Sequence, residues 1–520
     1  MSAEAAEIVN DHDSSRRRLP SDYLVYSVIA LAVLVTSAFF CRHAVFWYNE
    51  VCGMGIISRP HLADVLQPGL SMSDPIPLVY QTFIWLWNKL LIAVIGVPFA
   101  AWWLMLPSFF FAAGTVFITG VIARRLIGPG FVTWVVCAIC ATSATWLSVA
   151  VQMRYEGLLF LFSAVTVYFY VLLSQDRSGE GRHRWALRVA LGVSMALAVL
   201  TGYSAIFWLV TLFIIDIYRL IRRQMVIKDF LSYVIGAVLC LPWAAAVVIT
   251  ILRQGLDRSA LTQLWPDKPS AGLVASIYTT MTGSYAVVAL YVLAIVLLIV
   301  SWVASRRAKV GIDPGASTLQ WTMILSPALM ILLIVFYSTV LVPAGSLLVM
   351  RYFYLTWPML CLTMGQALSV IEKTWKPLRN PRVRATAIVL VVVLVMLQTL
   401  WFLRAYRATP HYIKHTMTPP YAATALFLSQ QSDLSDGTAA VYMGGRDLLV
   451  EGFDYYYVTK QGTQPGFTIW QTIPEGYDTL YIFHPTVMIW KPTATFLKSY
   501  VLQSTQKQPH LDIYVKVDAP

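Results

Sequence analysis

The sequence predicts an α-helical polytopic membrane protein, with about 11 transmembrane helices and a small C-terminal extracytoplasmic α/β domain. Three observations predict this fold class. Of the 520 residues, 58% are hydrophobic and 12% are charged, whereas soluble domains are about 25% charged. Apolar runs of about 20 residues recur, and a helix of that length crosses a bilayer. The last part of the chain is too polar to span. Together these observations exclude a soluble enzyme, a disordered chain and a coiled coil.

The net charge of +12 is distributed unevenly along the chain. Residues 401–520 contain nine Lys or Arg and nine Asp or Glu, so the whole excess lies in residues 1–400. There it is concentrated in short loops such as Arg16–Arg18, Arg124–Arg125 and Lys373–Arg384. Short basic loops stay on the cytoplasmic side of the membrane. The charge therefore indicates topology in a lipid bilayer and does not indicate a nucleic-acid partner.

The elements of the membrane domain follow from the apolar runs. Residues 1–22 are polar and are expected to form a disordered cytoplasmic tail. Residues 23–405 are expected to form the transmembrane domain, with an outer loop at residues 43–101. An odd number of spans after a cytoplasmic N-terminus places the C-terminus outside the plasma (cytoplasmic) membrane. The expected spans are 23–42, 102–123, 130–150, 154–174, 187–202, 204–221, 230–252, 284–305, 319–342, 348–371 and 387–405.

Residues 406–520 are expected to form the extracytoplasmic α/β domain, because short β-type runs alternate with helical ones. A cluster of acids at helical spacing, Asp447, Glu451 and Asp454, is interpreted as one solvated face. The expected helices are 419–431, 445–459 and 492–504, and the expected strands are Ala439–Met443, Thr479–Phe483 and Leu511–Val517.

The outer loop at residues 43–101 holds the clearest candidates for catalytic residues. Glu50 lies just outside the first span, one residue after the aromatic run Phe46–Tyr48, with Asn49 between them. Sugar transfer needs a carboxylate that accepts a proton or steadies an oxocarbenium. It also needs cations where a leaving phosphate gathers charge. Glu50 could supply the carboxylate, and Arg59, Arg154 and Arg351 lie near the same face.

Each of these residues also has a purely structural interpretation. Glu50 could be a solvated residue at a membrane boundary, and arginines at helix ends often extend toward lipid headgroups. Arg154 and Glu156 could form a structural ion pair. Asp216 lies beside Arg219 and is interpreted as structural.

Four short motifs occur in order along residues 20–405. The segment Trp47–Glu50 opens the outer loop, and Asp74–Tyr80 closes it with a Pro-x-Pro-Leu sequence. Met153–Leu158 begins a later span, and Arg351–Phe353 precedes Trp357-Pro358. These motifs resemble those of GT-C class membrane glycosyltransferases, in particular the bacterial relatives of protein O-mannosyltransferases and of lipid A aminoarabinose transferases.

The resemblance implies an inverting transfer of a sugar from a polyprenyl-phosphate donor to an extracytoplasmic acceptor, which is a glycan, a lipid or a protein. It implies a GT-C-like fold and an enzyme of the hexosyl- or pentosyltransferase type. It also assigns roles: Glu50 as the catalytic base, alone or with Asp74, Arg154, Arg351 and Arg59 as ligands of the donor phosphate, and Asn49, Tyr155 and Tyr352 as supporting residues.

Two positions depart from the motifs that the resemblance rests on. Asn49 stands where the family has an aspartate, and an amide cannot accept a proton at neutral pH. Asp74 stands where aminoarabinose transferases have a lysine, which weakens the case for a lipid A substrate. An inactive or repurposed member is an alternative. No cofactor is firmly implied, and assistance by a divalent metal stays open.

Two other functions compete with sugar transfer. A transporter or flippase of a lipid-linked saccharide would place ionisable residues near the midplane and show repeated halves, and the sequence shows neither. A polysaccharide polymerase or ligase would carry its chemistry in a large late loop, whereas the expected late outer loop, 343–350, is short.

Overall fold

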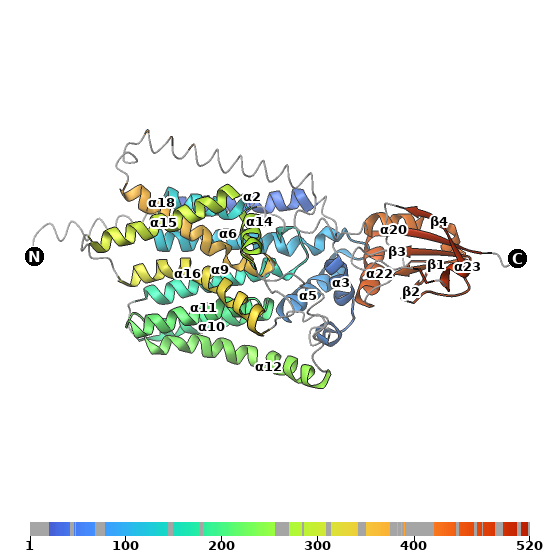
Figure 1. The fold of residues 1–520 in the computed structure, drawn as a ribbon, viewed down its shortest axis with the longest axis horizontal. Helices are drawn as coiled ribbons and strands as arrows, with labels where there is room; N and C mark the ends of the chain where they lie inside the picture. Colours follow the sequence, from blue (N-terminus) through green and yellow to red (C-terminus); the bar gives the residue numbers. More distant parts are fainter. Residues whose placement is uncertain are drawn as a thin grey trace, which may run out of the picture.

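The computed structural model shows a bundle of long helices with a small sheet domain at one end (Figure 1). The residues that the structure describes are 20–41, 46, 48–67, 78–143, 149–176, 180–254, 270–282, 285–307, 314–341, 350–374, 382, 386, 389, 421–443, 447–461, 465–470, 472–483, 492–493, 495–506 and 511–517.

Most helices of the bundle run side by side along its long axis (Figure 1). Their bounds are α2 Pro20–Cys41, α5 Leu78–Ile95, α6 Leu106–Ile127, α7 Phe131–Ala141, α9 Tyr155–Gln175, α10 Arg182–Thr201, α11 Ala205–Ile221, α12 Leu231–Gln254, α14 Ala271–Thr282, α15 Tyr285–Arg307, α16 Pro314–Phe336 and α18 Trp357–Thr374.

Among the described residues, eight helices are long and apolar enough to cross a membrane. They comprise α2, α5, α6, α9, α10, α12, α16 and α18 with their short extensions, and apolar stretches in α7 and α15 are shorter. The predicted span at 387–405 lies almost wholly outside the described residues. The structure therefore confirms a polytopic helical membrane protein with a C-terminal sheet domain.

Helices α2, α6, α7 and α9 contribute to one large apolar cluster of the bundle. The Tyr26 hydroxyl of α2 donates a hydrogen bond to Thr133 Oγ1 of α7 over 2.7 Å. The Tyr26 ring lies so close to Gly120 of α6 that a Cβ atom there would come within 2.9 Å of it. A small residue at this point lets the two helices approach closely, as is common between membrane helices.

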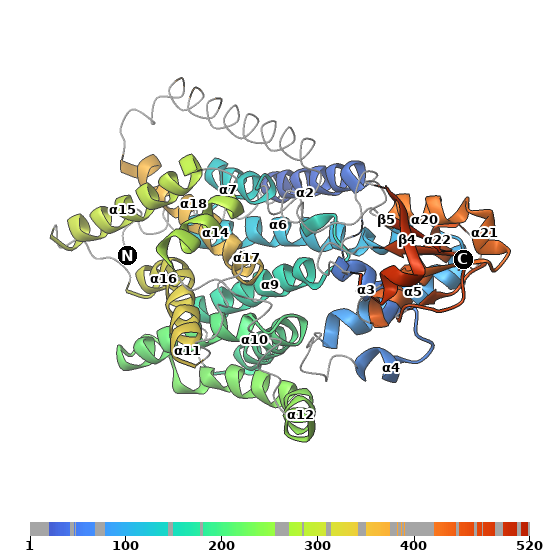
Figure 2. The ribbon, with the colours of Figure 1, turned by 45° about the vertical axis from the view of Figure 1, so that its right-hand side comes forward.

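Two short helices, α3 (Tyr48–Ile57) and α4 (Leu62–Leu66), lie together with α5 at the end of the bundle that carries the C-terminal domain (Figure 2). All three fall within the outer loop predicted at residues 43–101. The structure adds that α5 is itself long and apolar enough to cross a membrane. One face of α5 is buried, along Tyr80, Ile84, Asn88 and Leu91.

The C-terminal domain has a five-stranded sheet in the order β2-β1-β3-β5-β4. β1 pairs in parallel with β2 and β3, and β5 pairs antiparallel with β3 and β4. Helices α20 and α22 pack on this sheet (Figure 2). The bounds are α20 Tyr421–Ser429, β1 Ala439–Met443, α22 Asp447–Gln461, β2 Ile469–Trp470, β3 Thr479–Phe483, α23 Phe496–Ser499, β4 Tyr500–Gln506 and β5 Leu511–Lys516.

The structure corrects one predicted element of this domain. The helix expected at 492–504 is helical only over Phe496–Ser499, and β4 then begins at Tyr500. Val501 and Thr505 are β-branched and favour a strand. They lie opposite Val515 and Asp512 of β5, so pairing with β5 overrides the local helical pattern.

Candidate active site

The candidate site lies at the end of the bundle next to the C-terminal domain, and its first member is Glu50. Glu50 is in the first turn of α3, where the positive end of the helix dipole favours a carboxylate. It is 2% exposed. Its Oε1 atom accepts a hydrogen bond from the Met153 backbone N–H group, with 2.8 Å between N and O. This bond joins α3 to the segment that leads into α9 and fixes the orientation of the carboxylate.

The second part of the site is the start of α9. Arg154 is the N-cap residue of this helix in an extended conformation, and Glu156 is in the first turn. Arg154 Nε lies 3.2 Å from Glu156 Oε2, and the two side chains are only 10% and 4% exposed. The guanidinium of Arg154 also lies over the Tyr155 ring, 5.6 Å from its centroid. A largely buried acid–base pair therefore lies beside the amide that holds Glu50.

The third member is Tyr80, on the buried face of α5. Tyr80 is 4% exposed. Its hydroxyl makes no hydrogen bond to any residue that the structure describes. It lies close enough to Glu50, Glu156 and Arg154 to interact with their charges. Tyr80 is one of several buried polar groups that lack a hydrogen-bond partner among the described residues, and its place beside three charged side chains makes it a candidate for contact with a substrate.

The other predicted site residues are placed as follows. Asn49 is partly exposed on α3. Asp74 lies outside the described residues. Arg351 and Tyr352 lie on the short helix α17, Met350–Phe353, and the side chain of Arg351 is outside the description. The next turn carries Tyr354, whose ring packs 5.6 Å from that of Phe160.

Phe160 follows the Arg154–Glu156 pair by about one and a half helical turns. The turn that follows Arg351 contacts α9 at Phe160. The structure brings Glu50, Arg154 and Tyr155 together and does not describe the side chain of Arg351.

Arg59 has a defined partner of its own. Its Nη2 atom lies 3.2 Å from Glu451 Oε2, on α22 of the C-terminal domain. Its Nη1 atom donates to the Asp64 carbonyl oxygen over 2.9 Å. The phosphate-binding role expected for Arg59 stays a prediction, and the ion pair shows that this residue also joins the outer loop to the C-terminal domain.

Tyr80 and Glu156 are site residues that the sequence alone did not predict. Both residues occur inside the motifs noted above, so the signal was present in the sequence. Tyr80 ends the segment that closes the outer loop, and Glu156 is two residues from Arg154. The structure shows that residues from α3, α5 and α9 meet, which their spacing in the sequence does not show. In the described part of the chain, no group of three or more His, Cys, Asp or Glu residues could hold a metal ion.

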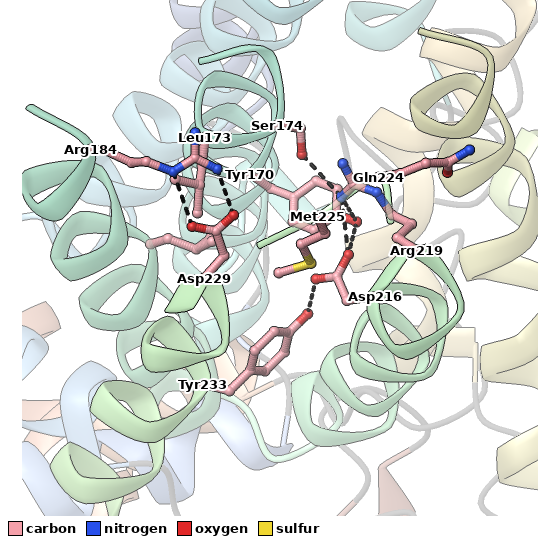
Figure 3. Close-up of a pocket in the computed structure, with 11 residues that line it drawn as sticks. Tyr170, Leu173, Ser174, Arg184, Asp216, Arg219, Gln224, Met225, Asp229 and Tyr233 are labelled. Atoms are coloured by element: carbon pink, nitrogen blue, oxygen red, sulfur yellow. Dashed lines mark hydrogen bonds and ion pairs between the residues drawn. The ribbon is translucent and has the colours of Figure 1, made fainter. Parts of the chain in front are cut away.

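A second polar cluster, at the opposite end of the same helices, lines a small pocket (Figure 3). Tyr170 lies 15 residues after Tyr155 on α9, about 22 Å along the helix axis. Asp216 accepts hydrogen bonds from the Tyr170 hydroxyl over 2.6 Å, from the Tyr233 hydroxyl over 2.8 Å and from Arg219 over 3.0 Å. The interpretation of Asp216 and Arg219 as structural agrees with this network.

The same pocket is bordered by a second ion-paired group. Arg184 Nη2 lies 2.7 Å from Asp229 Oδ2, and Arg188 Nε lies 2.8 Å from Asp229 Oδ1. The remaining space holds about one or two water molecules. Paired charges around a water-sized space tie α9, α10, α11 and α12 together and leave no room for a sugar or a lipid phosphate.

Comparison with solved structures finds the same architecture elsewhere. The crystal structure of ArnT from Cupriavidus metallidurans bound to undecaprenyl phosphate is similar with a TM-score of 0.53 and 14% identity, over 95% of this chain and 98% of that one. The apo state of the same protein gives a TM-score of 0.54 and 13% identity, over 95% and 97%. The sequence matches no family model and no curated protein. At this identity the likeness shows the fold, and the chain has a GT-C-like membrane glycosyltransferase fold, as the sequence predicted.

Proposed function

We propose that this chain is a glycosyltransferase that moves a sugar from a polyprenyl-phosphate-linked donor to an extracytoplasmic glycan, lipid or protein. The observation that carries the proposal is the buried group formed by Glu50, Arg154, Glu156 and Tyr80, whose hydroxyl bonds to no described residue. The fold supports it, since ArnT, which shares this fold, was crystallised with undecaprenyl phosphate.

In the proposed reaction, Glu50 acts as the general base. The acceptor hydroxyl oxygen forms a bond to the anomeric carbon while the bond from that carbon to the phosphate oxygen breaks. The acceptor proton passes to Glu50, and the lipid phosphate leaves with the electron pair, which gives inversion. The hydrogen bond from the Met153 N–H group holds the carboxylate in one orientation during this step.

The leaving phosphate needs positive charge and hydrogen-bond donors. Arg154 is buried at the start of α9. Because little water reaches a buried site, a guanidinium attracts an anion more strongly there than at the surface. Arg351 is proposed as a second ligand, since Tyr354, three residues later, packs on Phe160 of α9. Glu156 holds Arg154 in place, and Tyr80 can donate one hydrogen bond to the substrate. Asp74 remains a proposed second acid, as the sequence predicted.

The proposed orientation places the site on the outer face of the plasma membrane. The ion-paired arginines Arg124, Arg184, Arg188 and Arg219 all lie at the opposite end of the bundle from the C-terminal domain. Basic residues favour the cytoplasmic side. This arrangement supports a cytoplasmic N-terminus and an extracytoplasmic C-terminal domain.

The test is transfer of a labelled sugar from a polyprenyl-phosphate donor by the purified chain in lipid vesicles. Transfer by the wild type and its loss in Glu50→Gln are expected. Movement of the lipid across the vesicle membrane without any transfer would contradict the proposal and favour a flippase.

A further inference from the structure

Helix α22 of the C-terminal domain packs directly on α3, the helix that carries Glu50 (Figure 2). The two helices contribute to one apolar cluster rather than to two separate cores. The α3 side supplies Val51, Met54 and Ile57, and the α22 side supplies Phe453 and Tyr456. The C-terminal domain is therefore not attached to the bundle by the chain alone, because the burial of α3 depends on it.

The closest approach of the two helices is at Gly452 of α22. A Cβ atom at this position would collide with the Val51 carbonyl oxygen and would lie 3.1 Å from the Gly55 backbone nitrogen. Both contacts are with backbone atoms, which cannot rotate away as a flexible side chain can. Any residue larger than glycine must therefore push α22 and α3 apart.

Polar contacts fix the register of the same interface. The Tyr455 hydroxyl donates a hydrogen bond to Asn88 Oδ1 over 2.8 Å, and Asn88 Nδ2 donates to the Ile57 carbonyl oxygen over 3.1 Å. Asn88 is fully buried on the face of α5 that also carries Tyr80. The Arg59–Glu451 ion pair lies at the edge of this interface. One hydroxyl of the C-terminal domain thus connects α22 to both α5 and α3.

The opposite side of α3 faces the candidate site. Glu50 accepts the Met153 N–H bond there, and a Cβ atom at Gly53, one turn later, would lie 3.3 Å from Met153 Cε. Val51 and Gly55, which meet α22, are likewise one turn apart on another face. The ten-residue helix α3 is therefore held between α22 and the segment before α9.

We infer that the C-terminal domain positions the Glu50 carboxylate through the contact of α22 with α3, and that Gly452 is a positioning residue. The inference rests on the proposed function for the role of Glu50. In this arrangement, the packing of α22 on α3 holds α3 against Met153. The Glu50 carboxylate then stays at a fixed distance from the reacting groups. A displacement of 1 Å from reactive geometry can reduce a rate by about 100-fold, so a single added methyl group is enough to test it.

The experiment compares the full-length variants Gly452→Ala and Gly466→Ala in lipid nanodiscs. Gly466 is the matched control, because it lies in the same domain and no atom comes within 4 Å of a Cβ atom built there. Two measurements are made on each variant: hydrogen exchange of the α3 amides, and sugar transfer from a labelled polyprenyl-phosphate donor. For Gly452→Ala, faster exchange in α3 and a loss of transfer on the order of 10- to 100-fold are expected. Gly466→Ala should match the wild type in both.

A milder variant keeps the inference testable if Gly452→Ala does not fold. Tyr455→Phe removes one hydroxyl that donates to Asn88 and leaves the ring in place. It should speed exchange in α3 and lower transfer by a smaller factor, about threefold to tenfold.

The possible results separate this inference from the proposed function. Unchanged exchange in α3, or loosened α3 with wild-type transfer, would overturn the positioning role. No transfer by the wild type would refute the proposed function and with it the role given to Glu50. Faster α3 exchange in Gly452→Ala would even then support the contact of α22 with α3, because hydrogen exchange does not depend on a substrate.

Discussion

Replacing Glu50 with glutamine should remove most sugar transfer and leave the fold intact. Glutamine keeps the size of the side chain and an oxygen that can accept the Met153 N–H bond, which measures 2.8 Å in the structure. What is lost is the charge, and a hydrogen bond to a charged group exceeds a neutral one by about 1 kcal/mol. Because folded domains are stable by about 5–15 kcal/mol, this variant is expected to fold.

The expected effect on catalysis is larger than the effect on stability. An amide cannot accept the acceptor proton at neutral pH. A positioned general base contributes about 10²- to 10⁴-fold to the rate, which corresponds to about 2.7–5.4 kcal/mol of activation free energy. The loss of rate should therefore exceed any loss of folded protein by at least one order of magnitude.

The assay is the initial rate of transfer from a labelled donor at saturating concentrations, with the amount of folded protein measured in parallel. The matched control is Asp64→Asn, which neutralises a partly exposed acid in the same outer loop. This control should keep the wild-type rate. A Glu50→Gln rate within about threefold of wild type is far above what the loss of a general base allows and would refute Glu50 as the base.

Three further substitutions test the polar groups at each end of the bundle and in the C-terminal domain. Tyr80→Phe removes a buried hydroxyl without a described partner, so the free energy of unfolding should stay the same or rise slightly. Sugar transfer should fall about tenfold, and unchanged transfer would contradict a role of Tyr80 in the site. Asp216→Ala leaves Arg219 buried without its partner carboxylate and should cost about 3–5 kcal/mol in unfolding free energy, whereas the exposed Asp436→Ala should cost less than about 0.5 kcal/mol. Burial and then the nearby Glu451 raise the pKa of Asp454 from 3.8 to about 6. The folded state therefore holds this proton more tightly, and the stabilisation present below about pH 4 is lost as pH rises through 6. The pKa difference corresponds to about 3 kcal/mol, reduced to about 1 kcal/mol because the side chain is partly exposed, so the melting temperature should be higher at pH 5 than at pH 7, and Asp454→Asn should remove that difference.

The elements that the sequence predicted correctly depend on local signals. Apolar length alone predicts helices such as α2, α9 and α12, because a bilayer-spanning helix needs about 20 apolar residues whatever its neighbours are. β1 and β3 are short apolar runs buried in the sheet, and the sequence predicts both. β4 was predicted as a helix because its partner strand, β5, is not part of the local pattern.

Only the charged residues of the site could be predicted from the sequence, because charged residues are rare in this chain. Glu50 and Arg154 stand out because few charged residues are left once the basic loops are assigned to topology. Tyr80 lies next to them because α5 packs against α3 and α9. The spacing of residues in the sequence does not predict this packing. The Arg59–Glu451 pair joins residues 392 positions apart. The interpretation of Glu451 and Asp454 as part of one solvated face misses the contact of α22 with α3, since only the tertiary structure shows that contact.

The two polar clusters of the bundle contain the same residue types and differ in whether the tyrosine hydroxyl has a hydrogen-bond partner among the described residues. Tyr170 is buried, and its hydroxyl donates to Asp216 and accepts from Arg219. Tyr80 is equally buried and has carboxylates and a guanidinium nearby, yet its hydroxyl bonds to no described residue. Selection for stability alone would pair this hydroxyl, as it is paired at the other end, or replace it with phenylalanine, because an orphan buried donor costs about 1–3 kcal/mol. Structures tolerate such a cost mainly at functional sites. The contrast between the two tyrosines therefore supports the proposal that the end next to the C-terminal domain receives a substrate.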